Sequence, residues 1–284
     1  MAKKLWHEHP SETLRVTEGF RLADVDPDAT PGYSHGHSRG EKDLHERREL
    51  LGDLQERLYA ASRVGDDTDA VLLVLQAMDS AGKGGIVRHV VGGVDPQGVE
   101  LAAFKAPTDE ERTHDFLWRV EKRLPQRGFI GVFDRSHYED VLIGRVRSLA
   151  SDEEVERRYG AIREFEQRVA ASGIRLVKVM LHISRDEQKS RLMERLERPD
   201  KYWKYNPGDV DERMLWDDYM DAYQTVFDRT STPDAPWYVV PANHKWYARL
   251  AVQELLIAAL EGIDPQWPGA DFDVAAEKKR LAAS

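Results

Sequence analysis

Val71–Val87 reads VLLVLQAMDSAGKGGIV, and this stretch sets the architecture of the chain. The apolar run at its start predicts a buried strand, and the small residues after Gln76 predict a loop that leads into a helix. A glycine-rich loop lets the backbone close around an anion, and a helix N-terminus offers it unpaired N–H groups. The stretch therefore predicts a phosphate-binding loop (P-loop) between a strand and a helix.

This loop departs from the common P-loop pattern G-x-x-x-x-G-K-[ST] at both ends. Ala77 stands at the first position and Gly84 at the last, so the hydroxyl that commonly ligates Mg²⁺ is missing. A carboxylate, Asp79, lies inside the loop instead. The loop thus predicts binding of phosphate and metal by a protein that differs from ordinary nucleoside triphosphatases.

Composition excludes several functional classes. The chain has 284 residues with a formal net charge of −10, so a polyanionic ligand must meet a local basic surface, and we expect no nucleic-acid partner. It contains no cysteine, which excludes disulfides, thiolate zinc sites and thiol catalysis. We expect no membrane partner, because no apolar run approaches the roughly 20 residues that span a bilayer. The N-terminus has no apolar signal core, so we expect a cytoplasmic protein.

Outward from the loop, strand patterns alternate with helix patterns. Apolar runs predict strands at 71–75, 99–104, 129–133, 174–183 and 237–240. Helical spacing or capping-box signals predict helices at 41–63, from Thr108 to Leu124, from Ser151 to Gly173 and after the last strand. This alternation predicts an α/β fold with a parallel sheet covered on both faces. We expect an N-terminal arm at 1–40 and a single domain at 41–284.

A second polar group follows the strand at 129–133, which ends directly at Asp134 and Arg135. Because parallel strands end at one edge of a sheet, we expect these residues to lie near Asp79 and Lys83. Two carboxylates with phosphate oxygens suit Mg²⁺, and two cations can neutralise a phosphoryl group during transfer. The same pair alone also fits a capping carboxylate with a surface ion pair.

A third group is the basic, helical segment after the strand at 174–183. Arg191, Arg195 and Arg198 lie three and four residues apart, so they share one helix face. Next to a phosphate site, this segment predicts a lid at about 185–215 that closes over a polyanion. Asn243 and Lys245 follow the last strand at the same edge, where they could contact a nucleotide; Asn243 could equally cap the next helix.

With these motifs together, the chain resembles the type-2 polyphosphate kinase family. The resemblance is carried by AMDSAGKGG, FKAPTDEE with DFLWR, VFDRSHYEDVL, DEQKSRLMERLERPDKYWK and PWYVVPAN. It implies a three-layer α/β/α P-loop kinase fold with a helical lid. It also implies transfer of phosphate from inorganic polyphosphate to AMP or ADP, or to GMP or GDP, with Mg²⁺ or Mn²⁺ and in either direction. A homo-oligomer, either dimer or tetramer, is expected from the family.

The resemblance also implies roles for single residues. Asp79 and Asp134 would hold the metal, and Lys83 would grip the polyphosphate end. The loop positions that share this task are Ala81, Gly82, Gly84 and Gly85. The residues that would bind nucleotide and chain phosphates are Arg135, Arg191, Arg195 and Lys204. The motif HYEDVL resembles members that act on AMP and ADP, but many of those carry Asn where this chain has Asp134, so the preferred acceptor stays open.

Two other functions remain open from the residues alone. One is an ATP-dependent nucleoside monophosphate or small-molecule kinase, against which the altered loop argues. The other is a phosphate-binding scaffold without catalysis, against which the joint presence of Asp79, Lys83, Asp134 and Arg135 argues.

Overall fold

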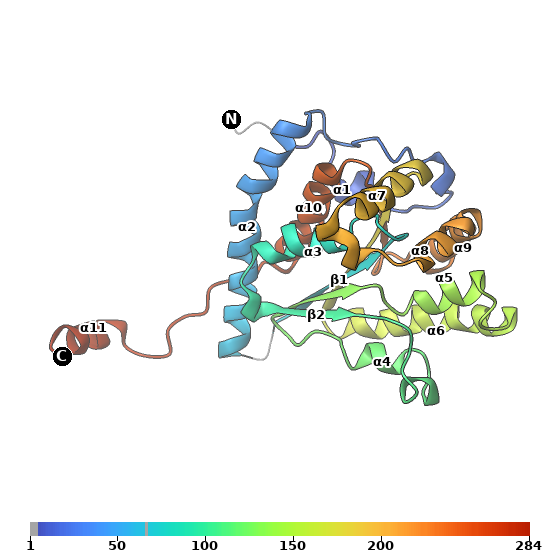
Figure 1. Cartoon of the computed structure of the whole chain (residues 1–284). Helices are drawn as coiled ribbons and strands as arrows, with labels where there is room; N and C mark the ends of the chain where they lie inside the picture. Colours follow the sequence, from blue (N-terminus) through green and yellow to red (C-terminus); the bar gives the residue numbers. More distant parts are fainter. Residues whose placement is uncertain (1–4, 66–67) are drawn as a thin grey trace.

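The computed structural model describes residues 5–65 and 68–284, so residues 1–4 of the expected arm lie outside it. Its centre is a sheet of five strands in the order β2-β3-β1-β4-β5, with all neighbouring strands parallel (Figure 1). The strands are β1 (Ala70–Gln76), β2 (Val99–Ala103), β3 (Ile130–Asp134), β4 (Ile174–His182) and β5 (Trp237–Pro241). The predicted α/β fold with a parallel sheet is confirmed.

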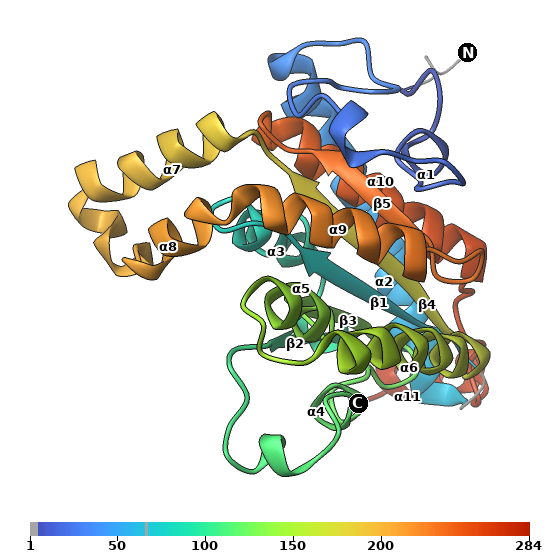
Figure 2. The same cartoon turned by 90° about the vertical axis from the view of Figure 1, so that its right-hand side faces the viewer.

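Helices cover both faces of this sheet, which gives three layers (Figure 2). One face carries α2 (His37–Val64), α3 (Lys83–His89) and α10 (Lys245–Ile263), and the other carries α5 (Glu139–Val146), α6 (Asp152–Ala171) and α9 (Trp216–Thr230). Every residue of β1 is buried, because helices exclude water from both of its faces. The first sheet-covering helix, α2, contains the helix predicted at 41–63 and buries Leu44, Leu51, Leu54 and Leu58, which lie at helical spacing.

The remaining elements are short or lie at the periphery. They are α1 (Pro10–Thr13), η1 (Leu22–Asp24), η2 (Val91–Gly93), η3 (Pro96–Gly98), η4 (Glu111–Thr113), α4 (Trp118–Glu121), α7 (Arg185–Glu197), η5 (Pro199–Lys204), α8 (Gly208–Met214) and α11 (Val274–Ala282). The segment expected to be a lid consists of α7, η5 and α8, which stand out from the body in Figure 2. None of the helices in the described part of the chain is long and apolar enough to cross a bilayer.

The segment before α2 packs onto the main core. Val16 N donates to Trp237 O (2.8 Å) and Val239 N donates to Leu14 O (2.9 Å), so this segment lies alongside β5. Leu14, Val16 and Trp6 are buried in the same apolar cluster as the strands. The segment is thus held by burial and backbone hydrogen bonds, although little of it is helical.

The continuous helix predicted from Thr108 to Leu124 is wrong. Its capping box does form: Thr108 N donates to Glu111 Oε2 (2.8 Å) and Glu111 N donates to Thr108 Oγ1 (3.2 Å). Only one 3₁₀ turn follows, and then the carboxylate of Asp115 accepts from Leu117 N (3.1 Å) and begins a new turn that leads into α4. Two local caps therefore divide the predicted helix, and its apolar residues begin only after the second cap.

A buried histidine at the end of β4 makes the free energy of unfolding depend on pH in the acid range. Burial lowers the pKa of His182 from 6.5 to about 4, and its Nδ1 has no hydrogen-bond partner among the described residues. The unfolded chain therefore binds a proton between pH 6.5 and 4 that the folded chain does not. Stability is lost as the pH falls through this window, by about 3 kcal/mol between pH 7 and pH 4 from this residue.

We expect His182→Gln to remove this contribution. Urea unfolding of both proteins at pH 7 and at pH 4 measures it, and the stability difference between them should change by about 3 kcal/mol in favour of the variant as the pH falls. A stability difference that stays constant with pH would show that His182 is not the source of the pH dependence.

Candidate functional site

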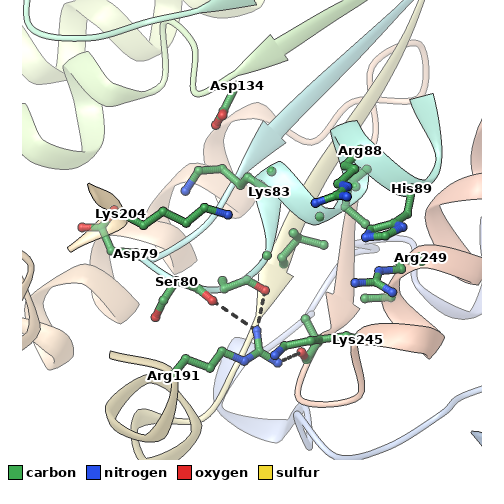
Figure 3. A pocket seen from close by; sticks show the side chains of 18 of the residues that line it. Asp79, Ser80, Lys83, Arg88, His89, Asp134, Arg191, Lys204, Lys245 and Arg249 are labelled. Atoms are coloured by element: carbon green, nitrogen blue, oxygen red, sulfur yellow. Dashed lines mark hydrogen bonds between the residues drawn. The ribbon is translucent and has the colours of Figure 1, made fainter. Parts of the chain in front are cut away.

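A cavity of about 760 Å³ opens at the carboxyl edge of the sheet, between the P-loop, the lid and the start of α10 (Figure 3). Its wall is strongly basic. The lining includes nine lysine or arginine residues: Lys83, Arg88, Arg135, Arg191, Arg195, Lys201, Lys204, Lys245 and Arg249. It includes only three acidic residues, Asp79, Asp134 and Glu194. This local excess of positive charge, in a chain of net charge −10, makes the cavity suited to a polyanion.

The P-loop turns sharply between β1 and α3. Ser80 and Gly82 both adopt positive φ, 63° and 124°, and α3 begins at Lys83. Lys83 Nζ donates to Ala77 O (2.9 Å), so its side chain folds back over the loop. Burial and then the charge of Arg135 lower the pKa of Lys83. A Cβ at Gly84 would meet no atom within 4 Å, so space does not explain the missing hydroxyl there.

The end of β3 brings the second predicted pair to the same edge. Arg135 Nη2 donates to Asp79 Oδ1 (2.8 Å), which joins the strand end to the P-loop. Its Nη1 lies 3.5 Å from Glu139 Oε2. Burial alone would lower the pKa of Arg135, but Glu139 and Asp79 raise it by more. Arg135 is therefore a fixed cation between two carboxylates, and Asp134 lines the cavity beside it.

Arg191 has partners other than the predicted phosphates. Its Nη1 donates to Ser80 O (3.2 Å) and Ala81 O (2.8 Å), and its Nη2 donates to Ala242 O (2.6 Å) (Figure 3). Nη2 also donates to Asn243 O (3.0 Å). Its Nε donates to Glu187 (2.7 Å). The buried guanidinium therefore ties the lid helix α7 to the P-loop and to the segment after β5. A contact between Arg191 and phosphate would require exchange of these bonds.

The other predicted lid residues line the cavity more openly. Arg195 donates to Asp209 Oδ2 (3.1 Å) and to Lys204 O (3.0 Å), so it fastens α7 to the far side of the lid. The side chain of Lys204 reaches into the cavity in Figure 3. Asn243 does not cap α10, because the N-cap there is His244. Its Oδ1 accepts from Ser184 N (3.0 Å) and so holds the residue that begins the lid.

Three further cavity residues were not predicted from the sequence. Arg88 and His89 come from the end of α3, and Arg249 comes from the first turns of α10 (Figure 3). Burial, then Arg249 and Arg88, lower the pKa of His89. A signal was present: Lys245 and Arg249 lie four residues apart directly after a strand end, which places them on one helix face.

The comparison with protein families identifies the chain. Residues 37–268 match the family model described as Polyphosphate kinase 2 (PPK2). The chain belongs to the polyphosphate kinase 2 family. The predicted family and the predicted class of enzyme, a polyphosphate kinase, are thereby confirmed.

Named relatives in the polyphosphate kinase 2 family are similar over most of their length. An AMP/ADP-polyphosphate phosphotransferase from Meiothermus ruber is 45% identical over 249 residues, 88% of this chain and 91% of that protein. An ADP-polyphosphate phosphotransferase from Rhodopseudomonas palustris is 46% identical over 237 residues, 79% of this chain and 80% of that protein. The crystal structure of polyphosphate kinase 2 from Arthrobacter aurescens TC1 is 57% identical, with a TM-score of 0.97 and full coverage of both chains.

Proposed function

We propose that this chain transfers the terminal phosphoryl group of inorganic polyphosphate to AMP or ADP, with guanine nucleotides as further candidate acceptors. The observation that carries the proposal is the basic cavity, whose nine lysine or arginine side chains outnumber its three carboxylates. A phosphate chain needs charge neutralisation along its length, and this excess of cations supplies it. The activities for which these relatives are named support the same reaction.

The donor set fits a magnesium ion. Asp79 and Asp134 line the same cavity, and no group of three or more His, Cys, Asp or Glu residues in 5–65 and 68–284 forms a complete protein cage. Mg²⁺ is commonly held by one or two carboxylates together with substrate phosphates and water. We propose that these two aspartates hold Mg²⁺, with Mn²⁺ as a substitute. When bound, the ion would neutralise charge on the phosphate oxygens.

The chemistry assigned to this chain's residues is positioning and charge neutralisation. A phosphate oxygen of the nucleotide attacks the terminal phosphorus of the chain, and the bond from that phosphorus to the bridging oxygen breaks. The shortened chain leaves with the bonding electrons. Lys83 and Arg135 stabilise the charge that spreads over the transferred phosphoryl group. Backbone N–H groups of the P-loop bind the adjacent phosphates of the polyphosphate. No covalent enzyme intermediate is needed.

The acceptor is assigned to the opposite side of the Asp79–Arg135 pair. A second cavity of about 220 Å³ lies there, and Asp79 and Arg135 line both cavities. Its other walls include Asn206 and Asp209 of the lid, and Tyr223. We propose that the nucleotide phosphate meets the end of the polyphosphate chain at this junction. The small volume implies that the lid opens to admit a nucleotide.

One assay tests the function. The purified protein is mixed with Mg²⁺, polyphosphate and AMP, ADP, GMP or GDP in separate reactions, and the nucleotide products are separated. We expect ADP or ATP to form from the adenine nucleotides with no other donor. Absence of product, or much faster transfer from ATP to an acceptor than from polyphosphate, would overturn the proposal. The preferred nucleotide follows from the relative rates.

Arg249 gives a more specific prediction. Arg249→Ala removes one cation that lines the large cavity but not the smaller cavity where the acceptor is assigned, so we expect the KM for polyphosphate to rise about 5- to 10-fold with kcat nearly unchanged. The KM for the nucleotide should stay constant. The measurement is initial rate against polyphosphate concentration at two salt concentrations, with Arg63→Ala, a surface variant outside the cavity, as the control. An unchanged KM for polyphosphate would show that the polyphosphate does not bind beside Arg249.

The cytoplasmic location and the homo-oligomer stay predictions. Nucleotide acceptors support the location, and the family supports the oligomer. Size-exclusion chromatography with light scattering tests the oligomer directly.

A further inference from the structure

A polar network without a place in the reaction lies buried behind the Asp134–Arg135 turn. Its centre is Lys178 of β4, which is completely buried. Lys178 Nζ donates to Glu166 Oε2 (2.6 Å), to the hydroxyl of Tyr138 (2.9 Å) and to Thr230 O (2.9 Å). These partners come from α6, from the segment after β3 and from the end of α9, so the network joins four separate elements.

Tyr138 contacts both charged members of this network. The hydroxyl of Tyr138 donates to Glu166 Oε1 (2.7 Å), and His137 Nε2 lies 3.3 Å from the same oxygen. The rings of Tyr138 and Trp237 pack edge to face, and the ammonium group lies 5.4 Å and 5.2 Å from their centroids. Burial lowers the pKa of Lys178, and Glu166 opposes that effect. The tyrosine is therefore held at its ring and at its hydroxyl.

A buried ion pair is a weak source of stability, because desolvation offsets its attraction. Its position suggests another use. Arg135 adopts a positive φ of 64°, which is strained for a residue with a side chain and persists only where the surroundings enforce it. Tyr138 lies three residues later, and its N–H donates to Ser136 Oγ (3.2 Å) within the same turn. The turn is thus fixed on one side by β1, where Arg135 N donates to Leu75 O (3.0 Å), and on the other by Tyr138.

We propose that Tyr138, held by Lys178 and Glu166, is a positioning residue that fixes the strained turn carrying Asp134 and Arg135. This inference rests on the proposed function, because it assigns those two residues to the transfer. Tyr138 touches no substrate in this scheme and lines neither cavity of the site. It acts on the orientation of Arg135 toward Asp79 and the transferred phosphoryl group.

The test is Tyr138→Phe, which keeps the ring and removes the hydroxyl. Because small displacements of a reacting group cost about 10- to 100-fold in rate, we expect kcat to fall about tenfold while both KM values change less than about twofold. The matched control is Tyr247→Phe. Tyr247 is also fully buried, and its hydroxyl donates to Pro31 O (2.8 Å); it belongs to α10, on the face of the sheet opposite α5 and α6. The control loses one hydrogen bond to a backbone carbonyl, and its kcat should be unchanged.

A double-mutant cycle separates positioning from general weakening of the fold. If Tyr138 acts through Arg135, Tyr138→Phe should lower kcat by less than about twofold in an Arg135→Ala background. Equal kcat in Tyr138→Phe and Tyr247→Phe, or losses that multiply across the cycle, would overturn the inference. Should Tyr138→Phe fail to fold, Ser136→Ala loosens the same turn and takes its place in the cycle.

Amide hydrogen exchange of the substrate-free protein gives a readout that does not depend on activity. We expect exchange in residues 133–139 to rise about tenfold in Tyr138→Phe and to stay unchanged in Tyr247→Phe. A wild-type protein that makes no product from polyphosphate would defeat the proposed function, and exchange would then decide the role of Tyr138. Unchanged exchange in both variants would defeat that role.

Discussion

Lys83→Ala is expected to lower kcat/KM for polyphosphate by about 10³-fold, because it removes a cation from the position where negative charge develops. Lys83 begins α3 and lies with Arg135 at the carboxyl edge of the sheet. Its ammonium group now donates to Ala77 O, a bond that a phosphate oxygen can replace. Fold stability should change little, since burial already disfavours the charged form of this lysine and lowers its pKa. Initial rates and thermal unfolding measure the two effects.

Lys42→Ala provides the control for the Lys83 variant. Lys42 lies exposed on α2, paired with Glu46 at 3.5 Å, and outside the cavity. Its replacement should leave kcat/KM within about twofold of wild type, as is common for surface positions. Should Lys83→Ala keep more than a tenth of the wild-type rate, the assignment of the loop as the donor site would be wrong.

The sheet and its polar edge could be predicted because both follow from local pattern. β1 is a run of apolar residues buried on both faces, and such runs distinguish parallel strands from amphipathic ones. Once the strands are parallel, topology brings Asp79 and Arg135 together, and the 2.8 Å contact between them follows. The sequence did not indicate that Glu139 would hold the other side of Arg135.

The remaining features depend on contacts between distant segments. The spacing of Arg191, Arg195 and Arg198 predicts a common face, but not what that face meets. In the structure Arg191 is buried against two backbone segments, whereas Arg198 is exposed and pairs with Asp200. Similarly, Arg249 comes to the cavity only because α10 packs beside α3. The spacing of residues along one helix does not identify the segment that packs against them.

Arg191→Ala is expected to reduce both stability and rate, unlike the loss of a simple phosphate ligand. Its guanidinium donates to four backbone carbonyls, at Ser80, Ala81, Ala242 and Asn243. Removal leaves these carbonyls without a donor in a buried place and takes the cation from the partly exposed Glu187, at a cost of about 3 kcal/mol in the free energy of unfolding. Because the P-loop would then lose its support, we expect kcat to fall about 100-fold.

The comparison that decides the role of Arg191 is with Arg191→Lys and Arg198→Ala, each measured by urea unfolding and by initial rates. A single ammonium group cannot reach carbonyls on two segments, so lysine should recover little of either loss. Arg198→Ala, an exposed arginine of the same lid, should cost less than about 1 kcal/mol, because surface ion pairs contribute little. If Arg191 served only to bind phosphate, removing one cation from a basic cavity would leave stability unchanged or raise it, and lysine would restore part of the rate. Joint loss of stability and rate, not recovered by lysine, therefore assigns Arg191 to the support of the loop and leaves phosphate binding to Lys83 and the open cations around it.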